Sequence, residues 1–192
     1  MRIVGGKYRG KKLWAPEGEN VRPTSERTRE AIFNILYSRL GGNYSSFDLV
    51  DIYSGTGAFG LEALSRGFNS VTFIDLDTLL VSRNAKMFLK EQEKISILKV
   101  DATNLPHSRK CFDIVFMDAP YAKGLTEKTL KQLMEKNWVK ENTLFIVEVK
   151  NNEKILIPEN LEVVDERIYG MAKVLFILKE KSFFVKLMLN FY

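Results

Sequence analysis

The chain has 192 residues, of which 45% are hydrophobic and 28% charged, and these proportions predict one globular domain with a sizeable core. Its single cysteine, Cys111, excludes an internal disulfide, and no apolar run approaches the roughly 18 residues of a membrane-spanning helix. The opening residues lack the apolar core of a signal peptide, so we expect a cytoplasmic protein without membrane contact.

The formal net charge of +5 is concentrated at the N-terminus. Residues 1–39 contain nine Lys and Arg against four Glu, a balance of +5, whereas residues 40–192 contain 20 residues of each sign. A basic segment ahead of a neutral body is typical of a polyanion-binding surface, and the alternative is a solvated basic tail without a specific partner. The candidate nucleic-acid contacts are Lys7, Arg9, Lys11, Lys12, Arg22, Arg27 and Arg29.

Residues 1–46 are interpreted as a basic N-terminal extension. Residues 2–4 and 11–15 are interpreted as two short strands around a glycine-containing turn, which predicts a β-hairpin. A helix is expected next, from the helix-start residues 23–25 to the glycine pair at 41–42. We expect this helix to pack on the body of the protein and still to present Arg27 or Arg29 to a ligand.

From residue 47 onward, apolar runs alternate with helical stretches. This alternation predicts an α/β fold with a mostly parallel sheet and helices on both faces. Two further strands joined at Gly170 predict a closing antiparallel hairpin, and residues 47–181 are interpreted as the main domain. The apolar tail, residues 182–192, is expected to pack on the core or on a second subunit. The expected strands are 47–53, 70–75, 95–100, 112–117, 143–149, 161–169 and 172–179, and the expected helices are 58–66, 77–90 and 125–136.

A glycine-rich loop follows the first strand of this domain. In Gly55-x-Gly57-x-x-Gly60 the glycines permit a tight turn and a close approach of the backbone to a ligand. Asp75 ends the next strand, 20 residues after Gly55, where an acid can accept hydrogen bonds from both hydroxyls of a ribose. The dinucleotide-binding fingerprint has the same pattern, so the loop alone does not separate NAD from S-adenosylmethionine.

Three further details favour S-adenosylmethionine. Asp51 is expected at the mouth of the loop, near the positively charged amino end of a methionine moiety. Asp101 ends the third strand, where it can accept from an adenine amino group with Ala102 beside the ring. The sheet also begins behind a basic extension, whereas dinucleotide domains often begin with their first strand. Helix capping by Asp75 or Asp101 is the structural alternative. The predicted cofactor-binding residues are Asp51, Ser54, Gly55, Thr56, Gly57, Gly60, Asp75, Leu76, Asp101 and Ala102.

A second motif, Asp118-Ala119-Pro120-Tyr121, stands at the end of the fourth strand. An exocyclic amine is a poor nucleophile because its lone pair is delocalised into the base, so group transfer needs acceptors for both of its N–H groups. The Asp118 carboxylate can accept one, and the carbonyl of Ala119, held by the rigid Pro120, can accept the other. Tyr121 can stack on a flipped-out base. These residues are the catalytic candidates, and the alternative is an ordinary strand-ending turn.

Metal and histidine chemistry are not needed for this reaction. The sulfonium of the cofactor already carries the activation of the leaving group, so positioning supplies most of the catalysis. The chain has one histidine, His107, which argues against a histidine-based site, and we expect no metal. Trp14 and Trp138 are interpreted as packing residues.

Taken together, the motifs resemble those of the bacterial small-subunit ribosomal RNA guanine-N2 methyltransferases of the RsmD type. The resemblance runs from residue 2 to about residue 179 and is most specific in residues 2–13, 22–36 and 60–67. It implies a Rossmann-like class I methyltransferase fold with a seven-stranded sheet, and methylation of a guanine N2 in 16S ribosomal RNA with S-adenosylmethionine. The partner would be this RNA, either free or within a partly or fully assembled small subunit.

The resemblance also implies roles for single residues, with one departure. Asp118 and Tyr121 take base-handling roles, and the basic hairpin with residues 22–29 takes RNA contact. The cofactor roles fall on Asp51, Gly55, Gly57, Asp75 and Asp101. The family motif usually reads Asp-Pro-Pro followed by Tyr or Phe, and Ala119 replaces the first proline. The required carbonyl is retained, while some rigidity is lost.

Three other functions stay open at this point. An adenine-N6 methyltransferase acting on DNA or RNA would use the same chemistry at the amine. A catalytically weakened RNA-binding relative would account for Ala119. An NAD-dependent oxidoreductase would account for the glycine loop, although the chain lacks a recognisable Ser, Tyr and Lys proton relay.

Overall fold

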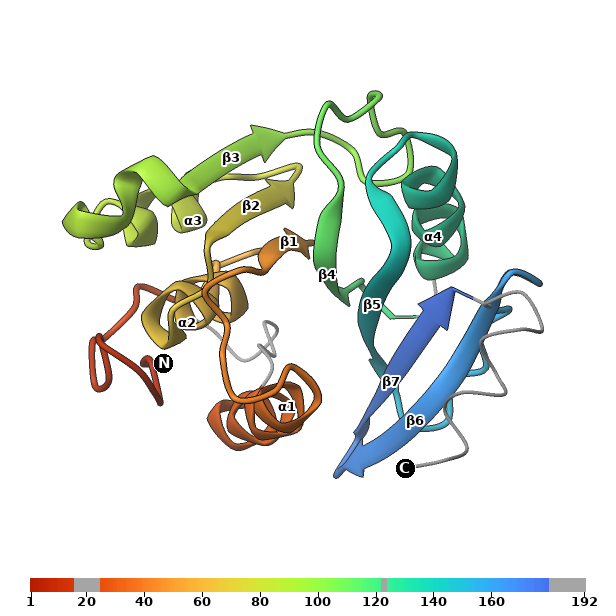
Figure 1. Cartoon of the computed structure of the whole chain (residues 1–192), viewed down its shortest axis with the longest axis horizontal. Coiled ribbons are helices and arrows are strands. Elements are labelled where there is room, and N and C mark those ends of the chain that lie inside the picture. Colours follow the sequence, from red (N-terminus) through yellow and green to blue (C-terminus); the bar gives the residue numbers. More distant parts are fainter. Residues whose placement is uncertain (16–24, 122–123, 180–192) are drawn as a thin grey trace.

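The computed structural model of the chain describes residues 1–15, 25–121 and 124–179. Its centre is a seven-stranded sheet in the order β3-β2-β1-β4-β5-β7-β6 (Figure 1). Strands β1 to β5 run parallel to one another, and β7 is antiparallel to both β5 and β6. The expected mostly parallel sheet with a closing antiparallel hairpin is therefore confirmed.

Each strand predicted from residue 47 onward is present. The strands are β1 (Asp48–Ile52), β2 (Ser70–Asp75), β3 (Ile95–Lys99), β4 (Phe112–Asp118), β5 (Val139–Lys150), β6 (Leu161–Tyr169) and β7 (Ala172–Lys179). The helices are α1 (Glu26–Arg39), α2 (Ala58–Arg66), α3 (Leu79–Ala85) and α4 (Leu125–Glu135), with one 3-10 helix, η1 (Leu89–Lys94). Strand β5 begins earlier than expected because its pairing with β4 continues across a register shift between Phe112 and Ile114.

Helix α1 has the predicted boundaries. The side chain of Ser25 caps it by accepting a hydrogen bond from the amide of Thr28 at 3.0 Å, and Gly41 follows its end. Ile32, Phe33 and Leu36 form its buried stripe.

The helix predicted for residues 77–90 is two shorter elements, α3 and η1. The amide of the Gln92 side chain donates to the carbonyls of Ala85 at 2.8 Å and Phe88 at 3.1 Å. Carbonyls at a helix end need hydrogen-bond donors, and here a side chain supplies them in place of the next helical turn. The interruption separates α3 from η1 and was not visible in the apolar spacing.

The predicted N-terminal hairpin is not a pair of strands. Arg2 and Lys12 form one isolated antiparallel bridge, and the chain between them makes turns. Its backbone bonds to helix α2: the amide of Lys7 donates to the carbonyl of Ser65 at 2.7 Å, and the amide of Tyr8 to the Ser65 hydroxyl at 2.8 Å. The two arms are joined by the backbone bonds from Ile3 to Lys11 and from Leu13 to Met1, but they pair at one bridge only, and the turn between them is docked on α2.

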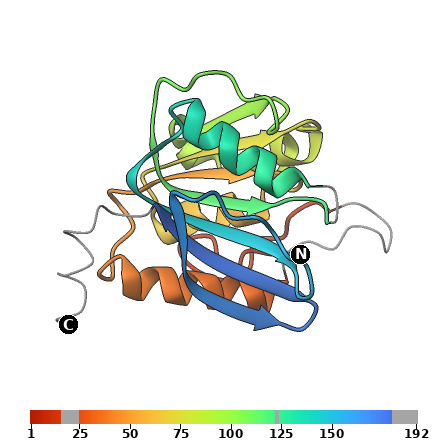
Figure 2. The ribbon, with the colours of Figure 1, turned by 90° about the vertical axis from the view of Figure 1, so that its right-hand side faces the viewer.

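Helices cover both faces of the sheet (Figures 1 and 2). Helices α1, α2 and α3 pack on one face, where the rings of Phe59 and Phe116 stack with centroids 3.6 Å apart. Helix α4 packs on the other face through Leu130 and Leu133. The first core also contains Ile3 of the N-terminal loop, so the extension is folded onto the main domain.

Two earlier expectations concern residues outside this description: the RNA contact at Arg22 and the packing of the tail, residues 182–192. Among the described residues, no helix combines the length and the apolar character needed to cross a membrane. The same residues contain no group of three or more His, Cys, Asp or Glu side chains placed to hold a metal ion.

Candidate active site

The register of the parallel strands brings the two predicted motifs to one edge of the sheet. Ile52 of β1 lies opposite Ile74 of β2 and Met117 of β4. The next residues on those two strands are Asp75 and Asp118. They therefore flank the start of the glycine loop, at the carboxyl edge where open α/β sheets bind ligands.

Asp75 is bonded to the glycine loop itself. Its Oδ2 accepts from the amide of Gly55 at 2.7 Å, and its Oδ1 from the amide of Asp77 at 3.0 Å. A carboxylate has about four acceptor positions, so capacity remains for hydroxyl donors. Helix capping does not explain this residue, because the first amide of α3, that of Leu79, donates to Asp77.

Asp101 stabilises a turn after β3 and keeps an open oxygen. Its Oδ1 accepts from the hydroxyl of Thr103 at 2.7 Å and from its amide at 2.8 Å, and these bonds lower the pKa of the carboxyl. Within the described part of the chain, Oδ2 has no hydrogen-bond partner. The neighbouring Ala102 is buried, and Leu76, at the end of β2, is 63% exposed. An ionised acceptor and exposed apolar surface thus occur at neighbouring strand ends.

The sequence analysis expected Asp51 at the mouth of the loop, but the structure places its side chain in the interior. It is 1% exposed, and its Oδ2 accepts from the amide of Gly60 at 2.9 Å. Burial raises the pKa of Asp51 to about 8, and the charge of Asp75 adds to this effect. Asp51 lies beneath the loop, where it holds the first turn of α2 to the end of β1.

Glycine is required at the three positions of the loop for different structural reasons. A Cβ on Gly60 would lie 2.4 Å from Phe73, and one on Gly57, which has a φ of 74°, would lie 2.6 Å from Val81. These two positions allow α2 and α3 to pack closely on β2. A Cβ on Gly55 would meet nothing closer than 4.0 Å, so this is the glycine that borders open space.

Ser54 and Thr56 point in different directions. The hydroxyl of Ser54 is buried and has no hydrogen-bond partner among the residues that the structure describes. Such a group is normally satisfied, by protein, water or a ligand. The hydroxyl of Thr56 donates to the sulfur of Met1 at 3.4 Å, so the side chain of Thr56 faces the N-terminal loop.

Two residues near the loop were missed by the sequence analysis. Tyr53 has a φ of 61°, and its hydroxyl lies 2.7 Å from that of Thr129 on α4. Burial raises the pKa of Tyr53, and Asp101 and Asp75 raise it further, which places its ring among the acids of this edge. An aromatic residue between a strand end and a glycine loop was the available signal.

Asn84 is the second missed residue. Its side-chain amide donates to the carbonyl of Thr56 at 2.8 Å and to that of Trp14 at 2.9 Å, and its Oδ1 accepts from the amide of Trp14 at 2.8 Å. The side chain is buried and so joins α3, the glycine loop and the N-terminal loop. No periodicity in the sequence indicated this contact.

The amine motif occupies the end of β4 and the turn after it. Asp118 is the last residue of the strand and is partly exposed, Ala119 is buried, and Pro120 is exposed. Tyr121 is half-buried. The strand thus brings the motif to the edge that also carries the glycine loop, while the roles of its four residues stay predictions.

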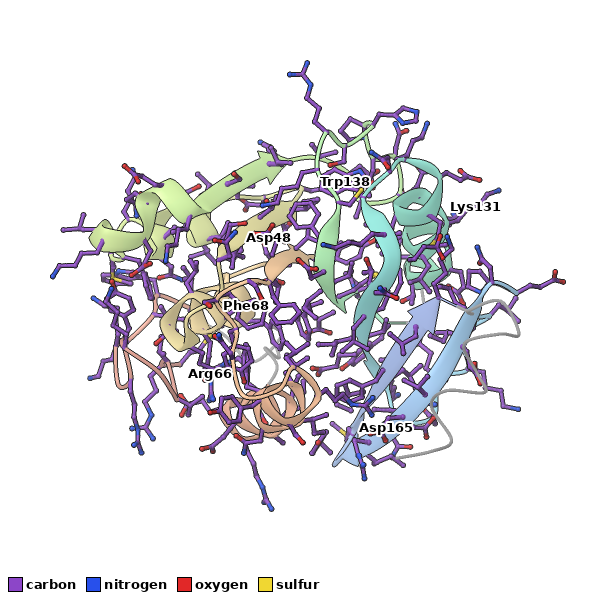
Figure 3. All side chains as sticks on the ribbon, viewed as in Figure 1. Asp48, Arg66, Phe68, Lys131, Trp138 and Asp165 are labelled. Atoms are coloured by element: carbon purple, nitrogen blue, oxygen red, sulfur yellow. The ribbon has the colours of Figure 1, made fainter. Side chains whose placement is uncertain are left out.

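Arg29 is not available to contact RNA, and this expectation is corrected. Its side chain is fully buried, with Nε 2.9 Å from Glu62 and a guanidinium nitrogen 2.6 Å from the carbonyl of Arg2. Arg66, labelled in Figure 3, donates to the other oxygen of Glu62 at 2.8 Å. The amide of Val4 donates to Glu62 as well, at 3.2 Å. Arg29 therefore joins α1, α2 and the N-terminal loop.

The other predicted RNA contacts that are described lie at the surface. Lys7 is exposed, but its Nζ lies 2.6 Å from Glu91, and this bond raises the pKa of Lys7. Lys11 lies over the rings of Tyr8 and Phe88. Arg9, Lys12 and Arg27 are exposed, and RNA contact stays a prediction for all of them.

Comparison with known proteins places the chain among methyltransferases. It is 32% identical to the Ribosomal RNA small subunit methyltransferase D of Haemophilus influenzae, over 90% of each chain. It is also 32% identical to the Escherichia coli protein of that name, over 90% of this chain and 86% of the relative. The solved structure of the Escherichia coli methyltransferase yhhF superposes with a TM-score of 0.77 at 28% identity, covering 95% of this chain and 99% of that one.

Residues 1–178 match the family described as Conserved hypothetical protein 95, and the chain belongs to this family. The resemblance read from the motifs is confirmed by these findings. The class I methyltransferase-like fold is confirmed by the superposition with yhhF.

Proposed function

We propose that this member of the family transfers a methyl group from S-adenosylmethionine to the exocyclic N2 of a guanine in small-subunit ribosomal RNA. The observation that carries the proposal is the pairing of Ile52 with Met117, which sets the glycine loop beside the amine motif. The names of the relatives, ribosomal RNA small subunit methyltransferases D, support the choice of substrate.

The polar groups around the glycine loop fit S-adenosylmethionine. Gly55 gives the backbone open space, and Asp75 has acceptor capacity for the two ribose hydroxyls. The open oxygen of Asp101 can accept from the adenine amino group, and the Ser54 hydroxyl can pair with the methionine end. When bound, this cofactor supplies a methyl group on a positively charged sulfur.

The residues of the amine motif would orient the base. The carboxylate of Asp118 accepts one N–H of the guanine amine, and the carbonyl of Ala119 accepts the other, which directs the nitrogen lone pair away from both acceptors. Tyr121 stacks on the base. As the nitrogen forms its bond to the methyl carbon, the carbon–sulfur bond would break and leave a neutral thioether. The nitrogen would lose a proton in this step, and the Asp118 carboxylate would accept it. Correct orientation supplies most of the rate enhancement in this scheme.

Methyl transfer to small ribosomal subunits from cells that lack the native enzyme tests the proposal. Labelled S-adenosylmethionine should yield N2-methylguanine on nucleoside analysis, and Asp118→Ala should lower kcat by about 100-fold or more, the effect of removing one group that acts in the transition state. Asp113→Ala, at the other end of β4, is the matched control and should retain activity. A product other than N2-methylguanine, or no transfer despite cofactor binding, would refute the assignment.

A weakened RNA-binding relative is the second candidate, favoured by Ala119 alone. Ala119 is buried, so a proline ring at this position would have to fit into the core on this face. If the native site is loosened by the missing ring, Ala119→Pro should raise kcat severalfold. An unchanged or lower kcat in a folded Ala119→Pro protein would remove the support for this candidate.

A further inference from the structure

An exposed aromatic residue and an arginine stack on each other beside the glycine loop. Trp14 is 50% exposed, so the expectation that it is a packing residue is wrong, whereas Trp138, labelled in Figure 3, is 3% exposed and packs as expected. The guanidinium carbon of Arg83, on α3, lies 3.4 Å from the centroid of the Trp14 ring. At this distance the planar guanidinium lies against the ring face.

The backbone under this stack is held rigidly. Both polar groups of the Trp14 backbone are bonded to the buried side chain of Asn84, and the same side chain holds the carbonyl of Thr56. Leu13 is buried in the core of that face. The exposed ring therefore has a defined position relative to the glycine loop, which a flexible surface residue would not have.

Two exposed lysines lie close in the chain to the two stacked residues, and within the described residues neither has an acidic partner. Lys12 is exposed two residues before Trp14, and Lys86 is exposed one helical turn after Arg83. Among the described residues, no ion pair involves either lysine or Arg83. Lys7 and Lys94, by contrast, both pair with Glu91 on the neighbouring 3-10 helix. Trp14, Arg83, Lys12 and Lys86 are called the Trp14 patch below.

We propose that the Trp14 patch binds an unpaired nucleotide of the RNA substrate, with the base stacked on the Trp14–Arg83 pair. This inference rests on the proposed function and names a contact for its substrate outside the site of methyl transfer. Unpaired bases in RNA stack on aromatic rings and on arginine planes, and the Trp14 patch offers both. Its two lysines supply charge for the adjoining phosphates, which orient the strand without reading its sequence.

Single-stranded RNA is favoured over a protein partner or a duplex by the form of the Trp14 patch. A base has two planar faces, and a stacked platform contacts one of them only where the base is not stacked within a helix. Lys12, Arg83 and Lys86, for which the described residues offer no ion pair, match a phosphate backbone. The contact of Asn84 with both Trp14 and Thr56 then places the bound nucleotide beside the loop that would hold the cofactor.

Tryptophan fluorescence tests the proposal directly, because one of the two tryptophans is exposed and the other is buried. A single-stranded RNA of about twelve nucleotides should quench the emission of the full-length protein, through stacking on Trp14. In Trp14→Phe the remaining emission, from Trp138, should not respond. The variant retains an aromatic ring at position 14 and should fold. Trp138 is present in both proteins, so the difference in quenching between them reports on Trp14 alone.

Variants at Arg83 separate stacking from charge. Arg83→Ala should weaken RNA binding by about tenfold, the scale of losing one stacking contact, and Arg83→Lys should lie between it and the wild type. Arg109→Ala is the matched control. Arg109 is an exposed arginine shortly before β4, at the amino ends of the parallel strands and so away from the glycine loop. Equal affinities for Arg83→Ala and Arg109→Ala would overturn the proposal.

Other RNA and polyanion probes complete the test. A duplex of the same sequence should quench less than the single strand, and heparin, a polyanion without bases, should bind without quenching. Equal quenching by heparin, or an RNA response that survives in Trp14→Phe, would refute a base stacked on Trp14.

These measurements need no methyl transfer, so the two proposals can fail separately. RNA quenching without any methylation of small subunits would leave the Trp14 patch standing and remove the proposed function. Methylation with a KM for RNA that is unchanged in Trp14→Ala and Arg83→Ala would remove the Trp14 patch alone.

Discussion

Helix α2 separates two charged clusters that have opposite surroundings. Glu62, in the middle of the helix, is fully buried and accepts hydrogen bonds from Arg29, Arg66 and the amide of Val4. Beyond the start of the helix, Asp75 at the end of β2 and Asp101 after β3 lie at the carboxyl edge of the sheet. Of the residues that the structure describes, only backbone amides and one hydroxyl donate to them. The first cluster is closed within the protein, whereas the second retains acceptor capacity.

This difference separates charges that build the fold from charges that are available to a ligand. The sequence offered no such distinction: Arg29 stands in a basic segment and was expected to meet RNA. A buried arginine is tolerated because its hydrogen bonds and its charge are matched inside the protein. Internal pairing, more than residue type, therefore decides which charges of this chain can serve function.

The largest expected effect comes from opening the closed cluster. Arg29→Met removes a buried partner of Glu62 and should lower the free energy of unfolding by about 3 kcal/mol, the lower end for broken buried pairs, because Arg66 remains. Urea unfolding measures the change. Arg27→Met, an exposed position on the same helix, should lie within about 0.5 kcal/mol of the wild type. Similar stabilities for the two variants would mean that the cluster is not a closed structural unit.

A smaller loss of stability is expected from a substitution in the glycine loop, which lies between the two charged clusters. Gly60→Ala brings a Cβ to 2.4 Å from Phe73 and should cost about 1–3 kcal/mol of stability through overpacking. Adding Phe73→Leu should recover part of this loss in thermal unfolding, because it removes the ring that the new methyl group meets. A fully stable Gly60→Ala protein would show that the close approach of α2 and β2 can relax.

The buried acid beneath the loop predicts a pH effect. The pKa of Asp51 is about 8 in the folded chain against an ordinary value of 3.8, so between these values the folded state holds a proton that the unfolded state has released. The stability that Asp51 contributes is therefore present below about pH 4 and is lost as the pH rises toward 8.

Asp51→Asn cannot ionise and provides the reference for this effect. From pH 5 to 8 the wild type should lose stability relative to the variant, by at most about 1.4 kcal/mol per pH unit. Urea unfolding across this range measures the difference. Parallel curves for the two proteins would contradict a raised pKa at Asp51.

Much of the fold was predictable because parallel strands and their helices leave strong apolar patterns. The strand ends then fixed Asp75, Asp101 and Asp118 at one edge, as the spacing predicted. The burial of Arg29 and the hydrogen bonds of Asn84 were not predictable, since both depend on partners distant in the chain. The N-terminal hairpin was predicted in outline only: its two arms pair at a single bridge, and the turn between them bonds to the distant Ser65 of α2.

Titration calorimetry of S-adenosylmethionine on the wild type and on Asp75→Asn tests the central claim most directly, namely that the acids at the sheet edge are open to a ligand. The wild type should bind the cofactor, and Asp75→Asn should bind at least about tenfold more weakly, because its amide has one acceptor oxygen where the carboxylate has two. Thermal unfolding checks that the variant is folded at the temperature of the titration. NAD should not bind either protein. Equal affinity of both proteins for S-adenosylmethionine, or binding of NAD in its place, would contradict the account.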